Sequence, residues 1–416
     1  MSVSEYHILI VNQHGDNRGD EAAMRAMVYA FVDRLGDVRF TILHQFRNRE
    51  LRPSLDAPVE WHSLVLSPIQ ALYLTALALA HYLGLGRSSI GRSTASRICA
   101  AYESADLVVS APGGPYFGDI YASHELVHWY FVWLAGLFRR RVFLYATSVG
   151  PFKNKFLNPI RRWLFRRFDG VCVREEVSAG YLRNFLPDLQ VTVTADSALQ
   201  RKPMPRGEPD GRSEEKLVVA VSAREHQFPN ARDASMRQSQ KEQYLNVLDA
   251  AIVHIANRQP SRFLLFPQLY GGRHSDVEFL RALSRRLPDG FDFEIVDPDA
   301  DADEQQNLFA QADLCIASRY HPQIFAAAAG VPGICISYEH KMIGFMRRIG
   351  LERFAFPIDE LDEVTVLSAL DEVLANRSTL REHLLRETAK LRKVSARTTD
   401  LAIELLPTRE SSAVRT

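Results

Sequence analysis

The chain of 416 residues lacks an excess of charge of either sign. Lys and Arg together number 50, Asp and Glu also number 50, and the formal net charge is therefore zero. A dedicated nucleic-acid-binding protein needs surplus basic residues to meet phosphates, so this balance argues against that class. With 46% hydrophobic and 24% charged residues, the composition is that of a folded globular protein.

Cysteine is scarce, and no two cysteines form a CxxC motif. Of Cys99, Cys172, Cys315 and Cys335, the last three lie in apolar runs, where a thiol acts as a small buried hydrophobe. This pattern predicts reduced thiols and an intracellular protein. The N-terminus also lacks a basic segment followed by a long apolar one, which predicts no signal peptide.

Long apolar runs are nearly absent. Residues 64–85 approach the length of a membrane-spanning helix, but Pro68 and His81 are among the residues that interrupt them. This favours a buried or surface-lying helix over a span. Arginines cluster at 139–141 and 161–167. They would suit an anionic membrane surface or an ordinary solvated face, and the sequence leaves both alternatives open.

Short β-branched runs alternate with longer helical stretches along the chain. Strands are predicted at 7–12, 38–43, 106–111, 142–149, 170–175 and 191–196, and again at 217–223, 262–268, 293–297, 313–318 and 333–338. Continuous apolar strands that alternate with helices indicate parallel sheets covered on both faces. We therefore predict an α/β protein with two doubly wound, Rossmann-like domains facing a cleft.

A segment rich in proline, glycine and charge separates the two series of strands, and it is predicted to be an interdomain linker at residues 201–215. The N-terminal domain then covers residues 1–200 and the C-terminal domain covers residues 216–375. A helical region and a flexible tail follow at 376–416, and the helix is expected to pack back across the first domain.

In open α/β sheets, ligands bind beyond the carboxyl ends of the strands, so the residues after each strand are candidates. The polar residues of the turn after the first strand include His14, Asp16, Asn17, Asp20 and Glu21. Asp20 as a helix N-cap and Glu21 at the positive helix end are structural explanations for two of them. The whole set suits sugar hydroxyls, as hydrogen-bond acceptors or as a base.

Two later turns add candidates at the same edge. Gly114, Tyr116 and Asp119 follow the third predicted strand, and Arg174 ends the fifth. The structural alternatives are glycine-turn geometry for the first group and a salt bridge at a helix start for Arg174. Asp196 places a further carboxylate after the sixth strand.

His124-Glu125-Leu126-Val127-His128 matches the HExxH pattern of zinc proteases. A catalytic zinc site needs a third ligand, and no glutamate lies between Glu125 and Glu175. We therefore predict no metal site here, and a zinc hydrolase stays a weaker alternative.

Cationic side chains follow three strands of the predicted second domain. Arg224 follows the first of these strands, Arg319 and His321 follow another, and Lys341 follows the next. Pro322 is expected at the first helical position, N1, because proline suits that position. A guanidinium and an imidazole would then stand at the positive end of a helix, which forms a prepared anion site.

Several short motifs follow one another between about His7 and about Gly350. They are N-R-G-D-E-A, S-A-P-G-G, S-V-G-P-F, V-R-E-x-x-S, A-D-S-A, S-R-Y-H-P and S-Y-x-x-K. In order and spacing they resemble the polysaccharide pyruvyl transferase family. The resemblance implies a GT-B-like fold and transfer of the pyruvyl group of phosphoenolpyruvate (PEP) to a sugar of a cell-surface polysaccharide or its lipid-linked precursor. A pyruvate ketal would form and phosphate would leave, with PEP as co-substrate and no other cofactor.

The resemblance also implies roles for individual residues. The PEP site would be formed by Arg224, Arg319, His321 and Lys341. The turn with Asp20 and Glu21 would lie on the acceptor side. For the mechanism, we expect Asp20 or Glu21 to act as the base and His321 to act as the proton donor or as the acid that assists the leaving phosphate. Family members usually carry Ala or Ser after R-x-H, whereas this chain has Pro322, which should leave the anion site intact.

Two other functions fit the same architecture. One is a nucleotide-sugar glycosyltransferase, in which Glu339 would contact ribose hydroxyls; the other is a non-catalytic glycan-binding module. The predicted partners are PEP and a glycan or lipid-linked saccharide, without nucleic acid. The predicted location is the cytoplasm, with peripheral association at the inner face of the plasma membrane as an option.

Overall fold

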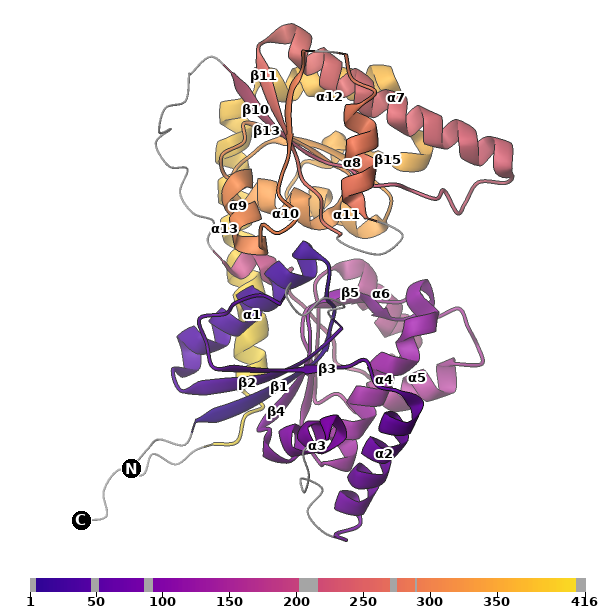
Figure 1. The fold of residues 1–416 in the computed structure, drawn as a ribbon, viewed down its shortest axis with the longest axis vertical. Helices are drawn as coiled ribbons and strands as arrows, with labels where there is room; N and C mark the ends of the chain where they lie inside the picture. Colours follow the sequence, from indigo (N-terminus) through magenta and orange to yellow (C-terminus); the bar gives the residue numbers. More distant parts are fainter. Residues whose placement is uncertain are drawn as a thin grey trace, which may run out of the picture. The chain divides into compact units, whose positions relative to one another are not determined.

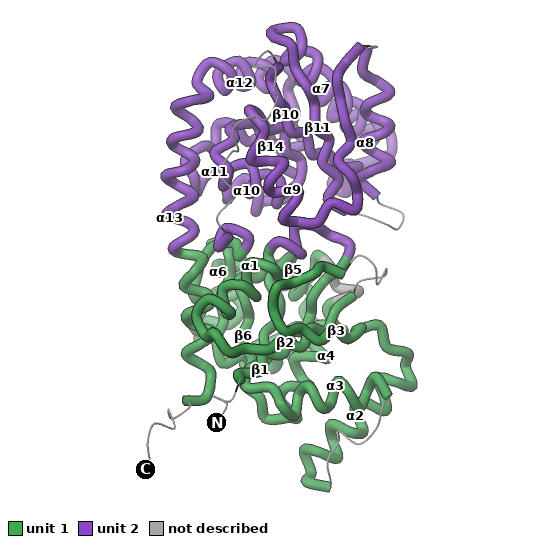
Figure 2. Tube along the Cα trace, turned by 60° about the vertical axis from the view of Figure 1, so that its left-hand side comes forward, with its two compact units in different colours: residues 1–15, 23–197, 394–416 green, residues 16–22, 198–393 purple. Residues whose placement is uncertain are grey.

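Two large parallel β-sheets organise the chain (Figure 1). The computed structural model describes residues 5–45, 52–85, 93–201, 216–269, 275–288 and 290–408. Contacts divide the chain into unit 1, drawn from residues 1–15, 23–197 and 394–416, and unit 2, drawn from residues 16–22 and 198–393 (Figure 2). The predicted α/β class with two Rossmann-like sheets is confirmed.

The sheet of unit 1 has seven strands in the order β3-β2-β1-β4-β6-β8-β9, and every pair is parallel. The strands are β1 (Tyr6–Gln13), β2 (Val38–His44), β3 (Val59–Ser63), β4 (Leu107–Ser110), β6 (Val142–Leu144), β8 (Gly170–Val173) and β9 (Thr192–Val193). A separate parallel pair joins β5 (Gly113–Phe117) to β7 (Thr147–Val149).

Helices cover both faces of this sheet. They are α1 (Arg18–Leu35), α2 (Pro68–Tyr82), α3 (Thr94–Ser104), α4 (Ala122–Leu137), α5 (Asn158–Phe165) and α6 (Glu176–Phe185). Side chains alternate between faces along a strand. Leu9 and Val11 of β1 therefore join the core beneath α2 to α6, whereas Ile8 and Ile10 join the core beneath α1. Burial on both faces explains the continuous apolar strands in the sequence.

Unit 2 is built on a six-stranded parallel sheet with the order β12-β11-β10-β13-β14-β15. Its strands are β10 (Leu217–Ser222), β11 (Ser261–Leu265), β12 (Asp292–Ile295), β13 (Leu314–Ala317), β14 (Gly333–Ser337) and β15 (Ala355–Pro357). Its helices are α7 (Ala234–Arg258), α8 (Asp276–Ser284), α9 (Ala302–Phe309), α10 (Tyr320–Ala328), α11 (His340–Arg348) and α12 (Glu363–Ala375).

The last helix, α13 (Arg377–Ile403), contributes to both units. Its residues as far as Lys393 cluster with unit 2, and the residues from Val394 cluster with unit 1. In unit 1, the Ser395 hydroxyl donates a hydrogen bond to the Asp196 carbonyl at 2.8 Å, and Ala402 is buried in the core that also contains α1. Within the predicted linker only Arg201 is described, and the predicted tail beyond residue 408 also lies outside the described residues.

The structure differs from the predicted elements in a few places. The strand predicted at 142–149 is divided into β6 and β7, with Ala146 between them at φ 43°. The strands β3, β5 and β15 were not predicted, because they are short and carry little apolar patterning. The apolar run at 64–85 contains the 15-residue helix α2. Among the described residues, no helix has both the length and the apolar character that crossing a bilayer requires.

All four cysteines are buried, and none of them forms a disulfide. Burial raises the pKa of the Cys172 thiol to about 12, with a smaller opposing effect from Arg397. These thiols therefore act as apolar core residues.

Candidate active site

Three cationic side chains of unit 2 follow three neighbouring strands. The strand β13 lies between β10 and β14, and the three run in parallel. Arg224 follows β10, Arg319 follows β13 and Lys341 follows β14. Because the carboxyl ends of parallel strands meet at one edge, the three cations gather on the same edge of the sheet.

Two tyrosines hold these cations at that edge. The Arg224 guanidinium carbon lies 4.7 Å from the centre of the Tyr338 ring, and Lys341 Nζ lies 5.4 Å from the centre of the Tyr320 ring. Both separations are within the range of cation–π attraction. The hydroxyl of Tyr338 also interacts with Arg319. Tyr338 thus connects the arginine after β10 with the arginine after β13.

Arg319 is buried and paired with Asp276 at the start of α8. Burial disfavours its charge, but Asp276 and Tyr338 outweigh this effect and raise the pKa of Arg319 above its ordinary value. Asp276 Oδ2 also accepts the backbone N–H groups of Gln268 at 3.1 Å and Leu269 at 3.0 Å. Arg319 Nε is buried and has no hydrogen-bond partner among the described residues. A fixed, permanently charged guanidinium therefore keeps one donor for a ligand.

Lys341 is held by a neighbouring carboxylate. Its Nζ lies 2.6 Å from Glu339 Oε2, and both side chains are largely buried. An incoming anion would compete with Glu339 for this ammonium. In the alternative glycosyltransferase function, Glu339 would contact ribose, but in this structure its carboxylate is paired with Lys341.

The helix α10 begins earlier than predicted. Arg319 is its N-cap with an extended backbone, φ −128° and ψ 145°, so that His321 lies in the first turn. Pro322 occupies the third helical position and not the predicted first position. Proline is accepted there because the first turn has no intrahelical acceptor for its N–H groups. Gly330 at φ 74° follows the helix, as expected for a C′ residue.

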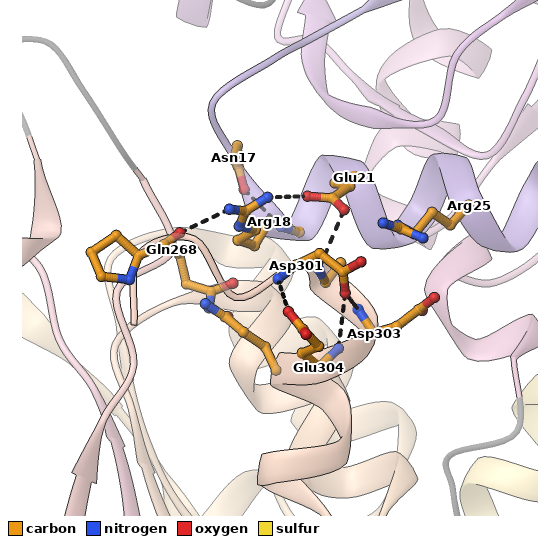
Figure 3. Close-up of polar contacts among 12 residues, drawn as sticks. Asn17, Arg18, Glu21, Arg25, Gln268, Asp301, Asp303 and Glu304 are labelled. Atoms are coloured by element: carbon orange, nitrogen blue, oxygen red, sulfur yellow. Dashed lines mark hydrogen bonds and ion pairs between the residues drawn. The ribbon is translucent and has the colours of Figure 1, made fainter. Parts of the chain in front are cut away.

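The acidic turn of residues 16–22 belongs to unit 2 by its contacts. The Arg18 N–H donates to the Gln268 carbonyl at 3.0 Å (Figure 3). The Arg18 guanidinium donates to the Pro298 carbonyl at 2.8 Å. An isolated antiparallel bridge joins Asn17 to Leu269. The turn was predicted as part of the N-terminal domain, but these contacts attach it to the loop that Asp276 holds.

Gly19 places this turn directly against His321. A Cβ atom built on Gly19 would overlap the imidazole of His321, so a side chain does not fit between them. The residues predicted as proton donor and base, His321 and the Asp20–Glu21 pair, therefore lie in the same part of unit 2.

The two acids of the turn have different surroundings. Glu21 Oε2 pairs with Arg18 at 2.6 Å, and Glu21 Oε1 accepts the Ala302 N–H at 3.3 Å (Figure 3). The helix α1 begins at Arg18, and Asn17 Oδ1 accepts the Gly19 N–H at 2.9 Å. Asn17, and not Asp20 as predicted, therefore caps the helix. Glu21 is committed to fixing the turn, which weakens it as the predicted base, and the same role stays a prediction for Asp20. Asp16 begins the turn with φ 60°.

In unit 1, three aromatic rings stack at the carboxyl end of β1. The His14 ring lies 4.3 Å from the Tyr116 ring with an interplanar angle of 7°, and 5.0 Å from the His128 ring. The Nε2 atoms of His14 and His128 are 2.8 Å apart, so one ring donates a hydrogen bond and the other accepts it. The structure thus brings together His14 and Tyr116, which were predicted as acceptor residues, and adds His128.

The glycines before Tyr116 are required by geometry. Gly113 has φ 156°, and a Cβ atom there would overlap the Tyr116 hydroxyl. Gly114 leaves ordinary contact distance to the same ring, 3.6 Å. The glycines therefore allow Tyr116 to stack on His14. This is the glycine-turn geometry that was named as the alternative to ligand binding for this motif.

Asp119 and Glu125 are both bound to Arg161. The guanidinium lies 2.8 Å from Asp119 Oδ1 and 2.6 Å from Glu125 Oε2, and Glu125 Oε1 accepts the Gly118 N–H at 2.8 Å. Burial opposes ionisation of Asp119, but hydrogen bonds from Arg161 and from the Lys153 N–H hold its pKa below the ordinary value. Asp119 was predicted to bind the acceptor, and this stays a prediction; its observed contacts fix a loop.

This arrangement weakens the zinc-hydrolase alternative. The glutamate that would act as base in HExxH, Glu125, is buried in an ion pair with Arg161. His128 is bonded to His14, and the side chain of His124 lies outside the described part of the structure. Among the described residues, no group of three or more His, Cys, Asp or Glu is arranged to hold a metal ion.

Arg174 forms a buried salt bridge, which was the structural alternative for this residue. Its guanidinium lies 2.7 Å from Asp196 Oδ2, and its Nε donates to the Ser148 hydroxyl at 2.8 Å. All three side chains are buried. Arg174 therefore joins the ends of β7 and β8 to the segment after β9.

Comparison with known proteins agrees with the motif order. The family model described as polysaccharide pyruvyl transferase matches residues 17–340. The chain belongs to the polysaccharide pyruvyl transferase family. The amylovoran biosynthesis protein AmsJ of Erwinia amylovora is 21% identical over 398 residues, which cover 91% of this chain and 94% of AmsJ.

Solved structures with a similar fold cover nearly the whole chain of this pyruvyl transferase family member. A putative UDP-N-acetylglucosamine 2-epimerase from Listeria monocytogenes has a TM-score of 0.58 at 11% identity, covering 92% of this chain and 91% of that one. Anabaena Alr3699/HepE in complex with UDP-glucose has a TM-score of 0.57 at 14% identity, covering 96% of this chain and 98% of that one. At these identities the likeness shows the GT-B-type fold alone.

Sequence reasoning missed several residues around the cations of this family member. Tyr338 is only one letter of the S-Y-x-x-K motif, and Asp276 gives no sequence signal because it looks like an ordinary acid in a first helical turn. His226 lies 5.6 Å from Tyr338, ring centre to ring centre. Burial, and then the charge of Arg224, lower the pKa of His226.

Proposed function

We propose that the chain transfers the pyruvyl group of PEP to a sugar of a cell-surface polysaccharide or its lipid-linked precursor, with formation of a pyruvate ketal and release of phosphate. The observation that supports this function is the row of Arg224, Arg319 and Lys341 on adjacent strand ends of unit 2. PEP carries a phosphate and a carboxylate on a three-carbon skeleton. Several fixed cations at short range match such a ligand better than a single phosphate site would.

Arg319 is the anchor of the proposed PEP site. It is buried, it is oriented by Asp276, and its Nε has no hydrogen-bond partner among the described residues. Arg224 and Lys341 would complete the neutralisation of PEP from either side. Fixed cations in a partly buried site need no reorganisation as charge moves during the reaction, which is how they lower a barrier.

The proposed chemistry uses His321 as an acid. Protonation of the PEP methylene carbon creates an oxocarbenium-like centre at the neighbouring carbon. A first sugar hydroxyl adds to that carbon, and Asp20 takes its proton. The bond to the phosphate oxygen then breaks, and phosphate leaves. A second hydroxyl closes the ketal. Of the two hydroxyl protons lost, one balances the proton that became part of the methyl group and the other leaves with phosphate.

Acceptor binding stays a prediction for His14, Gly114 and Tyr116 in unit 1. The stacked rings of His14 and Tyr116 offer polar edges close to the end of β1. Asp119 and Arg174 are committed to buried or partly buried ion pairs, so we expect them to support the acceptor residues indirectly.

The decisive assay follows phosphate release from PEP with candidate glycans, together with mass spectrometry for the pyruvate-ketal increment on the glycan. We expect Arg319→Ala to reduce turnover at least a hundredfold. Arg319→Lys should recover only part of it, because a lysine keeps the charge but loses the guanidinium fork. The matched control is Arg183→Ala, at an exposed arginine of α6. Undiminished turnover in both Arg319→Ala and His321→Ala would refute this site.

The glycosyltransferase alternative has one observation in its favour, the fold shared with a protein in complex with UDP-glucose. Thermal-shift measurements separate the two functions, because a ligand that binds only the native state raises its melting temperature. Stabilisation by PEP, lost in Arg319→Ala, supports pyruvyl transfer. Stabilisation by UDP or UDP-glucose and none by PEP supports glycosyl transfer.

A further inference from the structure

The helix α2 of unit 1 turns an apolar side to solvent. Ile69 is 80% exposed and Leu72 is 70% exposed, and the same side of the helix continues through Tyr73, Leu79 and Leu83. These positions follow the three- and four-residue spacing of one helical face. The sequence of α2, PIQALYLTALALAHY, contains no Asp, Glu, Lys or Arg. A surface helix ordinarily carries charged residues on its outer side, so this face is unusual.

The opposite side of α2 is firmly packed. Leu74 and Ala78 are fully buried in the core that contains α3 and α4. The Thr75 hydroxyl lies 3.0 Å from the hydroxyl of Tyr130 on α4. A capping box at Ser67 fixes the start of the helix. The outer residues are therefore exposed on a helix that is already docked to its own unit.

Apolar exposure continues on neighbouring elements of the same unit. The helix α4 contacts both α2 and α5. Leu126 is exposed on α4, Ile160 and Trp163 are exposed on α5, and Phe156 is exposed just before α5. Single exposed apolar residues are ordinary, but a series of them over three contacting helices marks a surface that meets another apolar phase.

Arginines accompany the aromatic residues of this surface. The Arg139 guanidinium carbon lies 5.6 Å from the Tyr82 ring centre, and the Arg167 guanidinium carbon lies 4.7 Å from the Trp163 ring centre. An atom built on Gly136 of α4 would lie 3.8 Å from the Arg167 guanidinium. Both arginines therefore flank the C-terminal part of α4. Interfacial aromatic rings with adjacent cations match the headgroup region of a bilayer.

We propose that this surface, defined by the outer side of α2 with Phe156, Ile160, Trp163, Arg139 and Arg167, docks on an anionic lipid bilayer. The apolar side chains would enter the boundary between headgroups and acyl chains. The arginines would meet lipid phosphates, which favours an anionic surface over a neutral one. A second copy of the chain fits less well, because a symmetric contact would bring the same arginines against each other. The proposal goes beyond the proposed reaction and does not depend on it.

Vesicle co-sedimentation tests the proposal without PEP or acceptor. Vesicles of phosphatidylcholine alone are compared with vesicles of equal parts phosphatidylcholine and phosphatidylglycerol. We expect binding to the anionic vesicles that falls steeply with salt. The double variant Leu72→Asp/Leu79→Asp should weaken it at least tenfold, and Arg139→Glu/Arg167→Glu should abolish the preference for anionic lipid.

The matched control is Val364→Asp, at an apolar residue of α12 in unit 2 that is 76% exposed. It should bind vesicles as the wild type does, and circular dichroism checks that every variant is folded. Absence of vesicle binding by the wild type, or equal binding by all variants, would overturn the proposal. So would light scattering that shows a dimer lost in Leu72→Asp/Leu79→Asp without any lipid binding, because a second copy would then cover the surface.

Discussion

The imidazole of His321 lies against the backbone of Gly19, with no room for a side chain between them. The two residues are 302 positions apart in the sequence (321 − 19), yet both belong to unit 2 by their contacts. The contact places the N-terminus of α1 and the N-terminus of α10 beside one another. Two positive helix ends therefore lie close to the proposed donor site.

Gly19→Ala should impair turnover without unfolding the protein. The added methyl group would displace the His321 ring or the turn that carries Asp20, and we expect at least a tenfold fall in kcat. The control is Gly344→Ala, because a Cβ atom at Gly344 in α11 would meet nothing within 4 Å. That variant should keep its activity and gain about 0.5–1 kcal/mol of stability from the better helix former. Equal activity of both variants would show that the contact has no catalytic consequence.

Asp276→Asn should act on PEP binding more than on the chemical step. Asparagine keeps an oxygen for the Gln268 and Leu269 amides but loses the charge that orients Arg319. We expect the KM for PEP to rise about tenfold with a smaller change in kcat, as for a positioning residue. Asp292→Asn removes an exposed partner of Lys216 and should change neither constant. A fall in kcat at unchanged KM would contradict this role.

Glu125→Gln should destabilise the fold. The substitution leaves Arg161 buried with Asp119 as its remaining charged partner. Breaking a buried pair in this way costs about 3 kcal/mol or more, measured as the free energy of unfolding in denaturant. Glu176→Gln, at an exposed pair with Arg183, should change it by less than about 0.5 kcal/mol. A stable Glu125→Gln protein that had lost a hydrolytic activity would instead revive the zinc-enzyme interpretation of HExxH.

His7 should make the fold sensitive to mild acid. Burial, reinforced by Arg39, lowers the pKa of His7 from 6.5 to about 4. Between these values the unfolded chain binds a proton that the native state does not, so stability falls as pH decreases from about 6.5 to about 4. We expect His7 alone to account for about 2 kcal/mol between pH 7.5 and pH 5.

The variant His7→Gln isolates this effect. Glutamine retains a polar side chain for Thr41 and Ser104, which lie 2.8 Å and 3.0 Å from the His7 ring nitrogens. Its unfolding free energy should depend less on pH in this window than that of the wild type. Parallel curves for the two proteins would show that His7 is not the responsible group.

The sequence predicted the sheets and the row of cations, because both depend on local patterns and on one general rule. Buried strands read as apolar runs, and the rule that ligands bind beyond the carboxyl ends of strands indicated Arg224, Arg319 and Lys341. Asp276 was not predictable, since its pairing with Arg319 depends on how two separate loops meet. The Arg18–Glu21 pair, by contrast, has a helical spacing of three residues that could have been noticed in the sequence.

The exchange of segments between the two units constrains how the protein can be dissected. The chain belongs to unit 1 up to Gly15, to unit 2 over residues 16–22, and to unit 1 again from Ala23. Within α13, the chain passes from unit 2 back to unit 1 at Val394. A cut at the linker would therefore produce two fragments, and each would lack a segment of its own compact unit. The N-terminal piece would lack the end of α13, where Ala402 is buried in the core of unit 1. The C-terminal piece would lack residues 16–22, in which the Arg18 N–H donates to the Gln268 carbonyl. Such pieces should be stable only when mixed, as complementing fragments.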